Sequence, residues 1–341
     1  MAGSSLPPPD RIQQMLLGFW VSRTLFTGVE LGVFDELAKG PASAEVLAYR
    51  MRLHPRALER LLNALVALGL LRLDNGRYAN TLEADTYLVK DRPTYVGGPV
   101  EHMARLHWRL WEYLPDAVRE NAPRVKQVFG PSFDLFQALA ADPQRLRAFV
   151  QGITLTLPTA QEIVSAYDFS PHRLLLDVGG GSGALCIAAV QRYPHLRAIV
   201  LEQPLVVQVA RENLEAHGVA DRVSVVEGDF FRKETIPTGA DVIALGWVLH
   251  DLTPHQARQV LRNCYDALQP GGAILVCEKL LDETRTAPLL TALLNLHDLV
   301  ATGGEEHTAT EYQQWLAEAG FTDFSVHILH GPRDLLVGWK R

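Results

Sequence analysis

The sequence predicts an α/β protein in which a mostly parallel sheet, wound with helices and ending in an antiparallel hairpin, follows a mainly helical N-terminal unit. Three observations predict this class. Apolar strand-like runs alternate with helical stretches from Arg173 onward, a glycine-rich turn follows the first such run, and upstream of Leu88 apolar residues recur at spacings of three and four. The 341 residues, 48% of them apolar, suffice for about two domains with real cores.

The N-terminal unit extends from about Arg11 to Leu88. Apolar residues follow helical spacing in "ERLLNALVALGLL" at 59–71, and "RLDNGRYANT" at 72–81 then supplies Asn75-Gly76, a tight-hairpin signal. Helices followed by a small hairpin are the order of a winged-helix unit, so we predict a winged-helix domain over residues 1–98.

The middle region, residues 99–167, is predicted as a helical linker and acceptor-pocket segment, because it is rich in Trp, Phe and His and is interrupted by prolines. Its aromatic side chains are candidates to line or cover a ligand pocket, with burial in the domain core as the alternative. They are Trp108, Trp111, Tyr113, Phe133 and Phe136.

The third region, residues 168–341, carries the sheet. The tail "FSVHILHGPRDLLVGWKR" at 324–341 indicates two strands around a Gly-Pro turn, and therefore an antiparallel end to the sheet. The candidate parallel strands are 173–178, 197–202, 223–228, 240–246 and 272–279.

Composition argues against several classes of partner. The formal charge of −7 and the absence of a long basic block disfavour nucleic acid and anionic membranes. No apolar run approaches the roughly 18 residues of a membrane span, and "MAGSSLPPPDR" at the start has no apolar targeting segment. Cys186, Cys264 and Cys277 are widely spaced in apolar runs, which predicts buried thiols and a cytoplasmic protein.

The glycine-rich turn lies in "LLLDVGGGSGALCIAAVQRYP" at 174–194, between a strand and a helix, where open α/β sheets bind ligands. No lysine follows for a phosphate-binding P-loop, and Gly179, Gly181 and Gly183 have the spacing G-x-G-x-G, a poor match to a dinucleotide fingerprint. S-adenosylmethionine offers an amino group, a carboxylate and a ribose without a pyrophosphate, which suits Asp177 and the loop backbone. A tight turn in a flavodoxin-like protein is the alternative.

The ends of the next strands carry further candidate cofactor residues. Glu202 closes the second strand and is placed to bind two ribose hydroxyls. Gly228, Asp229 and Phe230 follow the third strand, where Asp229 suits the adenine amine and Phe230 suits the ring face. A helix cap or a solvated charge is the alternative for either acid. Gly246 and Trp247 at the end of the fourth strand complete the predicted set.

A candidate general base follows the fourth strand. Thr253-Pro254 is a helix-start signal, so His250 and Asp251 lie in the strand-to-helix loop and face the same crevice. Imidazole, with a pKa near 6.5, can accept a proton at working pH. Glu278 or Glu306, or both, can orient its second nitrogen. The alternatives are a structural histidine, a lysine-paired Glu278 and a solvated Glu306.

From about Leu16 to the C-terminus the sequence resembles the S-adenosylmethionine-dependent, metal-independent small-molecule O-methyltransferases, which include acetylserotonin, plant caffeate-type and bacterial natural-product enzymes. The motifs are "LLDVGGGSG", "EGDFF", "VLHDL", "LQPGGAILVCEKLLDE" and "GGEEHTATEYQQWLAEAGF". The resemblance implies a class I methyltransferase domain behind a winged-helix dimerisation domain, a homodimer, no metal and S-adenosylmethionine as cofactor. It implies His250 as general base, braced by Glu278 and Glu306, and a cofactor site including Asp177, Gly179, Gly181, Glu202, Asp229 and Phe230.

The sequence departs from this family at several positions. Leu252 replaces a usual Trp, Trp247 stands where the hydroxyindole enzymes have Arg, and His307 replaces a usual Arg. His297 and Asp298 occupy places that are mostly uncharged in relatives, which predicts a more polar, charge-selective acceptor pocket, with charges on a solvated helix face as the alternative. Asp251 and Thr302 complete the predicted acceptor residues.

The predicted function is therefore methyl transfer to a small-molecule hydroxyl. A phenol is favoured over an alkyl alcohol, because proton transfer from a phenol of pKa near 10 to an ordinary imidazole is uphill by roughly 5 kcal/mol, and an alkyl alcohol is far worse. One alternative is an enzyme on the same scaffold that uses the cofactor for another step. The other is a DNA-binding regulator, suggested by the winged-helix pattern and disfavoured by the acidic charge.

Overall fold

The computed structural model describes residues 10–92, 94–131, 133 and 157–341. It divides into two compact units, Met1–Leu106 and His107–Arg341. The three-part division at 98/99 and 167/168 stays a prediction. Phe136 lies outside the described residues.

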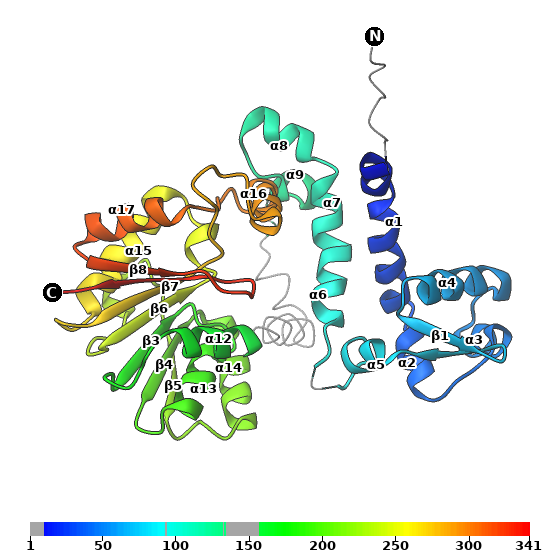
Figure 1. The fold of residues 1–341 in the computed structure, drawn as a ribbon, viewed down its shortest axis with the longest axis horizontal. Coiled ribbons are helices and arrows are strands. Elements are labelled where there is room, and N and C mark those ends of the chain that lie inside the picture. The colour runs from blue at the N-terminus through cyan, green and yellow to red at the C-terminus, as the bar shows by residue number, and fades with distance from the viewer. Residues whose placement is uncertain (1–9, 93, 132, 134–156) are drawn as a thin grey trace, which may run out of the picture. The chain divides into compact units, whose positions relative to one another are not determined.

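The first unit is mainly helical and carries one small hairpin (Figure 1). Asn75 and Gly76 have φ angles of 50° and 74°, the left-handed conformation that the predicted tight turn requires. The order of helices and then a hairpin is the predicted one. The elements are α1 (Asp10–Glu30), α2 (Val33–Ala38), α3 (Ala44–Met51), α4 (Pro55–Ala67), β1 (Leu71–Asp74), β2 (Arg77–Asn80), α5 (Leu82–Tyr87) and α6 (Gly97–His102).

The core of this unit is formed by α2, α3, α4 and the hairpin. Phe34, Leu47, Leu62 and Leu65 are fully buried in it. The hydroxyl of Ser43 caps α3, and Thr81 caps α5, each accepting from a backbone N–H in the first turn. The helix α1 is different, because only Gly28 and Val29 near its end are buried.

The second unit begins with short helices. They are the end of η1 (Met103–His107), then α7 (Trp108–Trp111), α8 (Leu114–Glu120), α9 (Val125–Phe129) and α12 (Leu157–Ala166). The helix α16 (Leu289–Ala301) packs against α7 and α8.

The described part of this unit forms a seven-stranded sheet in the order β5-β4-β3-β6-β7-β9-β8. The first five of these are parallel, and β9 runs antiparallel to both β7 and β8, so the predicted fold class is confirmed. The strands are β3 (Leu174–Val178), β4 (Arg197–Glu202), β5 (Val223–Glu227), β6 (Val242–Gly246), β7 (Ala273–Cys277), β8 (Thr322–His327) and β9 (Leu335–Trp339).

Helices cover both faces of the sheet (Figure 1). Neighbouring residues of one strand serve opposite cores, as Leu175 and Leu176 do. On one face lie α12, α13 (Ala184–Arg192) and α14 (Pro204–Ala216), and on the other lie α15 (Pro254–Ala267) and α17 (Ala309–Ala319). This arrangement brings the carboxyl ends of β3 to β7 to one edge, where the loops carry the predicted site residues.

Within the described ranges, no helix combines the length and the hydrophobicity needed to cross a bilayer. Cys186, Cys264 and Cys277 are buried and carry free thiols, as the apolar runs around them predicted.

Candidate active site

The glycine-rich turn connects β3 to α13. Gly179, Gly181 and Gly183 all have positive φ angles, of 69°, 56° and 78°. Glycine adopts this left-handed conformation without strain, which explains its repeated use in the turn. A Cβ on Gly179 would lie 2.8 Å from Val248, in the loop that follows β6. A side chain at Gly179 would therefore collide with the loop that carries His250.

Asp177, at the end of β3, is buried beneath this turn. Burial raises the pKa of its carboxyl to about 7, and the nearby charge of Arg333 partly opposes that rise. The thiol of Cys186 lies 3.9 Å from its Oδ2. A buried carboxyl with so weak a set of protein partners is suited to a polar ligand group.

Glu202, at the end of β4, lies against the glycine turn. Its Oε1 accepts a hydrogen bond from the backbone N–H of Gly181 at 3.0 Å, and its Oε2 accepts from that of Gln203 at 2.7 Å. Burial raises the pKa of this carboxyl. The carboxylate is thus held in place beside the predicted ribose site.

The loop after β5 places Phe230 next to the same turn. A Cβ on Gly179 would lie 3.8 Å from the ring of Phe230. Asp229 is exposed, and its Oδ1 accepts from the backbone N–H of Phe231 at 2.9 Å. Gly228 is required by packing, since a Cβ there would lie 2.6 Å from Leu201.

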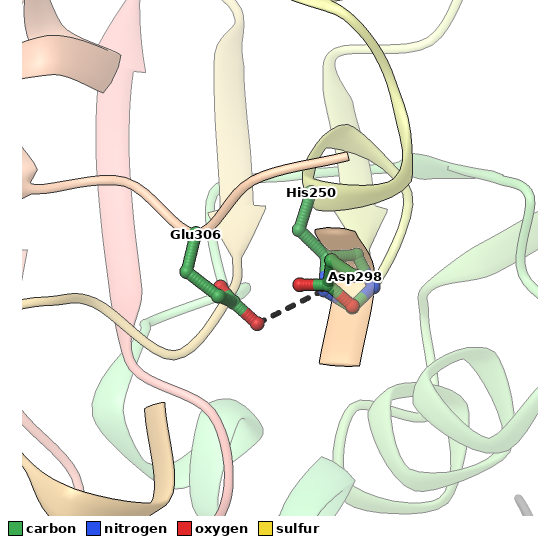
Figure 2. Close-up of side chains that lie close together, drawn as sticks. All are labelled: His250, Asp298 and Glu306. Carbon is green, nitrogen blue, oxygen red and sulfur yellow. Dashed lines mark hydrogen bonds and ion pairs between the residues drawn. The ribbon is translucent and has the colours of Figure 1, made fainter. Parts of the chain in front are cut away.

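His250 lies in η4 (Leu249–Asp251), directly after β6, and its side chain is 14% exposed. Its Nδ1 lies 3.0 Å from Oε1 of the buried Glu306 (Figure 2). Because a carboxylate only accepts hydrogen bonds, Nδ1 carries a proton and Nε2 is the nitrogen available to a substrate. Asp251 is the acid beside Nε2, with Oδ2 at 3.7 Å.

Glu278 does not hydrogen-bond to the imidazole. From the end of β7 its Oε1 accepts from the backbone N–H groups of Val248 and Leu249, at 2.9 and 3.0 Å. It therefore fixes the loop that carries His250, while Glu306 contacts the ring. The carboxyl is fully buried, and burial raises its pKa.

Charges around His250 strongly favour its protonated form. Burial lowers the pKa of the imidazole, but the charge of Glu278, the hydrogen bond to Glu306 and the charge of Asp251 outweigh it and raise the pKa to about 10. The ligand-free imidazole is thus a much stronger base than a free histidine.

Asp298 lies beside the same nitrogen. Its Oδ2 is 3.8 Å from Nδ1 of His250 and has no hydrogen-bond partner among the described residues (Figure 2). Burial raises the pKa of Asp298 to about 8, partly opposed by the charge of His250. Asp298, one of the predicted acceptor residues, therefore lies directly beside the imidazole of His250.

His297 is held by the aromatic residues of the middle region. The indole N–H of Trp111 donates to Nδ1 of His297 at 3.1 Å, and the ring of His107 lies 4.2 Å from it, centroid to centroid. Burial lowers the pKa of His297. Thr302 instead closes the end of α16, where its hydroxyl donates to the carbonyl of Asp298 at 3.3 Å.

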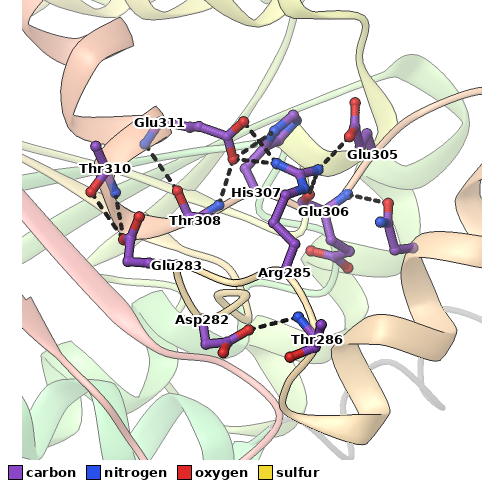
Figure 3. A network of polar contacts seen from close by, with 11 residues as sticks. Asp282, Glu283, Arg285, Thr286, Glu305, Glu306, His307, Thr308, Thr310 and Glu311 are labelled. Atoms are coloured by element: carbon purple, nitrogen blue, oxygen red, sulfur yellow. Dashed lines mark hydrogen bonds and ion pairs between the residues drawn. The ribbon is translucent and has the colours of Figure 1, made fainter.

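The loop that carries Glu306 is fixed by an arginine (Figure 3). Arg285 donates from Nη1 to both carboxylate oxygens of Glu311, at 2.8 and 2.7 Å, and from Nη2 to Glu305 and to the carbonyl of Glu306. Burial lowers the pKa of His307 to about 4, so this histidine is neutral at pH 7. Arg285 supplies the positive charge beside the loop.

The other two departures lie elsewhere around the site. Leu252 is buried in the core on the α15 face. Trp247 has a φ angle of 56° and stacks on Arg333, whose guanidinium carbon lies 4.3 Å from the ring centroid.

His250, Asp298 and Glu306 also have the spacing of a metal site, with one candidate ligand atom of each within 4.8 Å of the others. The same closeness follows from an imidazole hydrogen-bonded to one carboxylate and flanked by a second. The predicted absence of a metal stays a prediction.

Sequence reasoning missed Arg285, Arg333, Asn295 and Gly304. Asn295 accepts from the backbone N–H of Glu306 at 3.0 Å, and a Cβ on Gly304 would lie 2.0 Å from the carbonyl oxygen of His250. Only Gly304 carried a signal, in the Gly-Gly pair ahead of Glu306. The others act across long sequence separations that no local pattern reveals.

The residues at this edge fit S-adenosylmethionine. The glycine turn leaves backbone open to a ligand, Asp177 is a buried acid with few partners, Glu202 is held at the turn and Phe230 flanks it. A doubly wound sheet with these features and an antiparallel last pair of strands defines a class I methyltransferase.

Residues 111–322 match the family model of the O-methyltransferase domain, and residues 13–90 match that of the O-methyltransferase dimerisation domain. The chain belongs to the O-methyltransferase family.

Several named relatives are similar in sequence to nearly the whole chain. Acetylserotonin O-methyltransferase from Bos taurus is 39% identical over 95% of each chain, and 3-hydroxy-5-methyl-1-naphthoate 3-O-methyltransferase from Streptomyces sahachiroi is 37% identical over 94% of this chain and 93% of its own. The structure of human N-acetylserotonin methyltransferase in complex with SAM is similar, with a TM-score of 0.89 and 34% identity over 100% of this chain and 99% of that one. The protein is an S-adenosylmethionine-dependent O-methyltransferase, so the predicted family, enzyme class and cofactor are confirmed.

Proposed function

We propose that the enzyme methylates a phenolic hydroxyl of a small aromatic molecule, with His250 as the general base. The observation that carries the proposal is the hydrogen bond between Nδ1 of His250 and Glu306, which leaves Nε2 to accept a proton. General-base catalysis of this kind contributes about 10² to 10⁴ to a rate.

S-adenosylmethionine, when bound, supplies a methyl carbon made electrophilic by the positively charged sulfur. Asp177, the glycine turn, Glu202 and Phe230 would hold it at the carboxyl edge of β3 to β5. His250 takes the hydroxyl proton on Nε2, and Glu306 stabilises the imidazolium that forms. Glu278 keeps the loop in place through the backbone of Val248 and Leu249.

The raised pKa of His250 supports a phenolic acceptor. In the ligand-free enzyme the neighbouring acids raise the pKa of His250 to about 10, so this imidazole is a stronger base than a free histidine and proton transfer from a phenol of pKa near 10 is less uphill. The same value means that the ligand-free imidazole is protonated at neutral pH. A positive charge bound in the cleft lowers its pKa, and the rate should therefore rise with pH through the neutral range.

The acceptor class is supported by the relatives. Two named relatives act on a hydroxynaphthoate and on acetylserotonin, both hydroxylated aromatic molecules. Trp111, His107 and His297 form an aromatic and polar cluster beside Asp298 from which such a ring could be bound. Asp251 adds negative charge near Nε2 of the base, and Asp298 adds a polar carboxyl group beside Nδ1.

We also propose a homodimer, since residues 13–90 match a dimerisation domain. That match and the burial of Leu58, Leu62 and Leu65 of α4 in the core argue against a DNA-binding role. A different reaction on the same scaffold is disfavoured by the O-methyltransferase relatives. The cytoplasmic location stays a prediction from cysteine usage.

The test is His250→Ala. We expect methyl transfer to a phenolic acceptor to fall by about 100-fold or more, while S-adenosylhomocysteine binding measured by calorimetry changes less than about threefold. In the wild type, kcat/KM should rise with pH from about 6 to 8, because the base must be unprotonated.

The matched control is His255→Ala, at an exposed histidine in the first turn of α15. It should keep the wild-type rate and pH profile. Turnover by His250→Ala close to wild type would remove His250 from the mechanism.

A further inference from the structure

Arg333 is a buried cation that neither the sequence motifs nor the proposed mechanism uses. It lies between β8 and β9, two residues before β9 begins, and only 8% of it is exposed. Because β9 pairs antiparallel with β7, the start of β9 lies at the same edge as the carboxyl ends of β6 and β7. Arg333 is therefore part of the edge that carries the cofactor residues.

The guanidinium is tightly enclosed at the end of β6. Its Nη1 lies 3.0 Å from the position that a Cβ on Gly246 would take, so the missing side chain of Gly246 makes room for it. On another side it stacks on Trp247, 4.3 Å from the ring centroid. Both neighbours belong to the predicted cofactor set.

No hydrogen bond or ion pair to Arg333 is formed within the described part of the chain, and its Nε is buried without a partner. A guanidinium has five N–H donors, and a buried charge without hydrogen bonds is costly. Gly246 and Trp247 hold the group in place but offer it only van der Waals and cation–π contact. The guanidinium therefore has donors available to bind an anion.

Asp177 supplies the complementary charge nearby. The positive charge of Arg333 opposes the rise in the pKa of Asp177, which places the two groups within electrostatic reach. Among the described residues no ion pair joins the two groups, since Asp177 contacts the thiol of Cys186 and Arg333 stacks on Trp247, so an acid and a guanidinium are available at the same edge to two different ligand groups. An amino acid moiety carries that pair of opposite charges, an ammonium and a carboxylate.

We propose that Arg333 binds the carboxylate of the amino-acid end of S-adenosylmethionine, opposite Asp177, which binds the ammonium. The inference rests on the cofactor placement proposed above. Arginine suits the task because its planar fork donates two parallel hydrogen bonds to a carboxylate. The strained backbone at Trp247 holds the ring that positions the fork.

The test compares two ligands by calorimetry. S-adenosylhomocysteine carries the amino acid end, and 5′-methylthioadenosine lacks it. In Arg333→Met, which keeps an apolar stem of similar length, we expect S-adenosylhomocysteine affinity to fall about tenfold or more and 5′-methylthioadenosine affinity to change less than about twofold. Arg333→Lys keeps the positive charge but not the forked guanidinium, so its affinity for S-adenosylhomocysteine should fall by less than in Arg333→Met. Its affinity for 5′-methylthioadenosine should again be nearly unchanged.

The matched control is Arg258→Met, because Arg258 also stacks on a tryptophan, 4.9 Å above Trp315 on α17, away from this edge. Both ligands should bind it as they bind wild type. An equal loss of both ligands in Arg333→Met and Arg333→Lys would make the residue structural, and an unchanged affinity for S-adenosylhomocysteine would place the carboxylate elsewhere. Either result overturns the proposal, whereas a wild type that binds neither ligand would overturn the cofactor site itself.

A carboxylate on the acceptor is the other source of such an anion. An aromatic carboxylate such as 1-naphthoate, titrated into the protein saturated with S-adenosylhomocysteine, distinguishes the two. Arg333→Met should leave that affinity within about twofold of wild type. A selective loss of naphthoate binding with S-adenosylhomocysteine unaffected would contradict the cofactor assignment.

Discussion

At the scale of single residues, two carboxyl groups lie close to the same imidazole nitrogen, and one of them is hydrogen-bonded to it. Oε1 of Glu306 lies 3.0 Å from Nδ1 of His250, and Oδ2 of Asp298 lies 3.8 Å from it. Buried like charges this close do not both ionise readily, so one of them keeps its proton at neutral pH. Burial and the neighbouring acids raise the pKa of Asp298 to about 8, which makes Asp298 that group.

The raised pKa of Asp298 predicts a dependence of stability on pH. Between about pH 4 and pH 8 the unfolded chain releases this proton and the folded protein keeps it, so stability falls as pH rises through that window. Asparagine carries no such proton. We therefore expect Asp298→Asn to have a melting temperature at least about 2 °C above wild type at pH 8, with the difference vanishing toward pH 4.

Thermal unfolding followed by circular dichroism at pH 4 to 8 measures this difference. Asp221→Asn, at an exposed acid in the turn before β5, is the control, and its offset from wild type should stay small from pH 4 to 8. A wild type whose stability runs parallel to that of Asp298→Asn across the window would show that Asp298 is ionised in the folded protein.

The sequence identified these residues, but it did not reveal which groups each of them contacts. His250, Glu278 and Glu306 were found because strand ends and helix-start signals are local patterns. The contact between Glu278 and the backbone of Val248 and Leu249 was not foreseen, since it depends on the register that places the end of β7 beside the end of β6. Asp298 was predicted as an acceptor residue from the family resemblance, which does not reveal that its side chain also lies beside Nδ1 of His250.

At the scale of elements, two loops are joined to form the site. The backbone N–H of Glu305 donates to the carbonyl of His250 at 2.9 Å, and Gly304 packs against the same carbonyl with no room for a Cβ. The side chain of Glu306 then reaches the imidazole from the opposite loop. Accurate placement of the base depends on how firmly the second loop is held, and Arg285 holds it.

Loss of Arg285 should therefore impair catalysis without impairing cofactor binding. In Arg285→Met the acids Glu305 and Glu311 lose their shared partner, and the loop carrying Glu306 becomes less constrained. We expect kcat to fall about tenfold while S-adenosylhomocysteine affinity stays within about twofold of wild type. Arg285→Lys should recover only part of the rate, because an ammonium cannot reproduce the forked contacts.

Steady-state kinetics across pH, with calorimetry on the same samples, measure both effects. Arg232→Met, which removes an exposed ion pair with Glu234, is the matched control and should behave as wild type. A wild-type kcat in Arg285→Met would mean that Asn295 and the Gly304 contact alone fix the loop.

The elements themselves were largely predictable. Alternating strands and helices gave the sheet because buried parallel strands are continuous apolar runs, and the Gly-Pro turn at 331–332 separated β8 from β9. The ends were less certain: β7 covers Ala273–Cys277, shorter than the predicted 272–279, because Glu278 turns toward the β6 loop. Arg285 lies in a segment with no periodic pattern, so its role had no sequence signal.

At the scale of the whole molecule, α1 presents apolar side chains that its own unit leaves uncovered. Leu16 is 66% exposed and Trp20 is 59% exposed, and Ile12, Met15 and Phe19 are exposed as well. A helix apolar on so many sides is stable in water only when another surface covers it. The match of residues 13–90 to a dimerisation domain indicates that a second copy of the chain is that surface.

The double variant Leu16→Glu, Trp20→Glu tests this assembly. Burying two carboxylates in an apolar interface is costly, so we expect light scattering after gel filtration to give a mass near the 37.8 kDa of one chain, against about twice that for wild type. Ile328→Glu, at an exposed apolar residue between β8 and β9, is the control and should keep the wild-type mass. Circular dichroism should show unchanged helix content in both, because Leu16 and Trp20 lie outside the core of their unit. A double variant that keeps the wild-type mass would mean that α1 is covered by something other than the dimer contact.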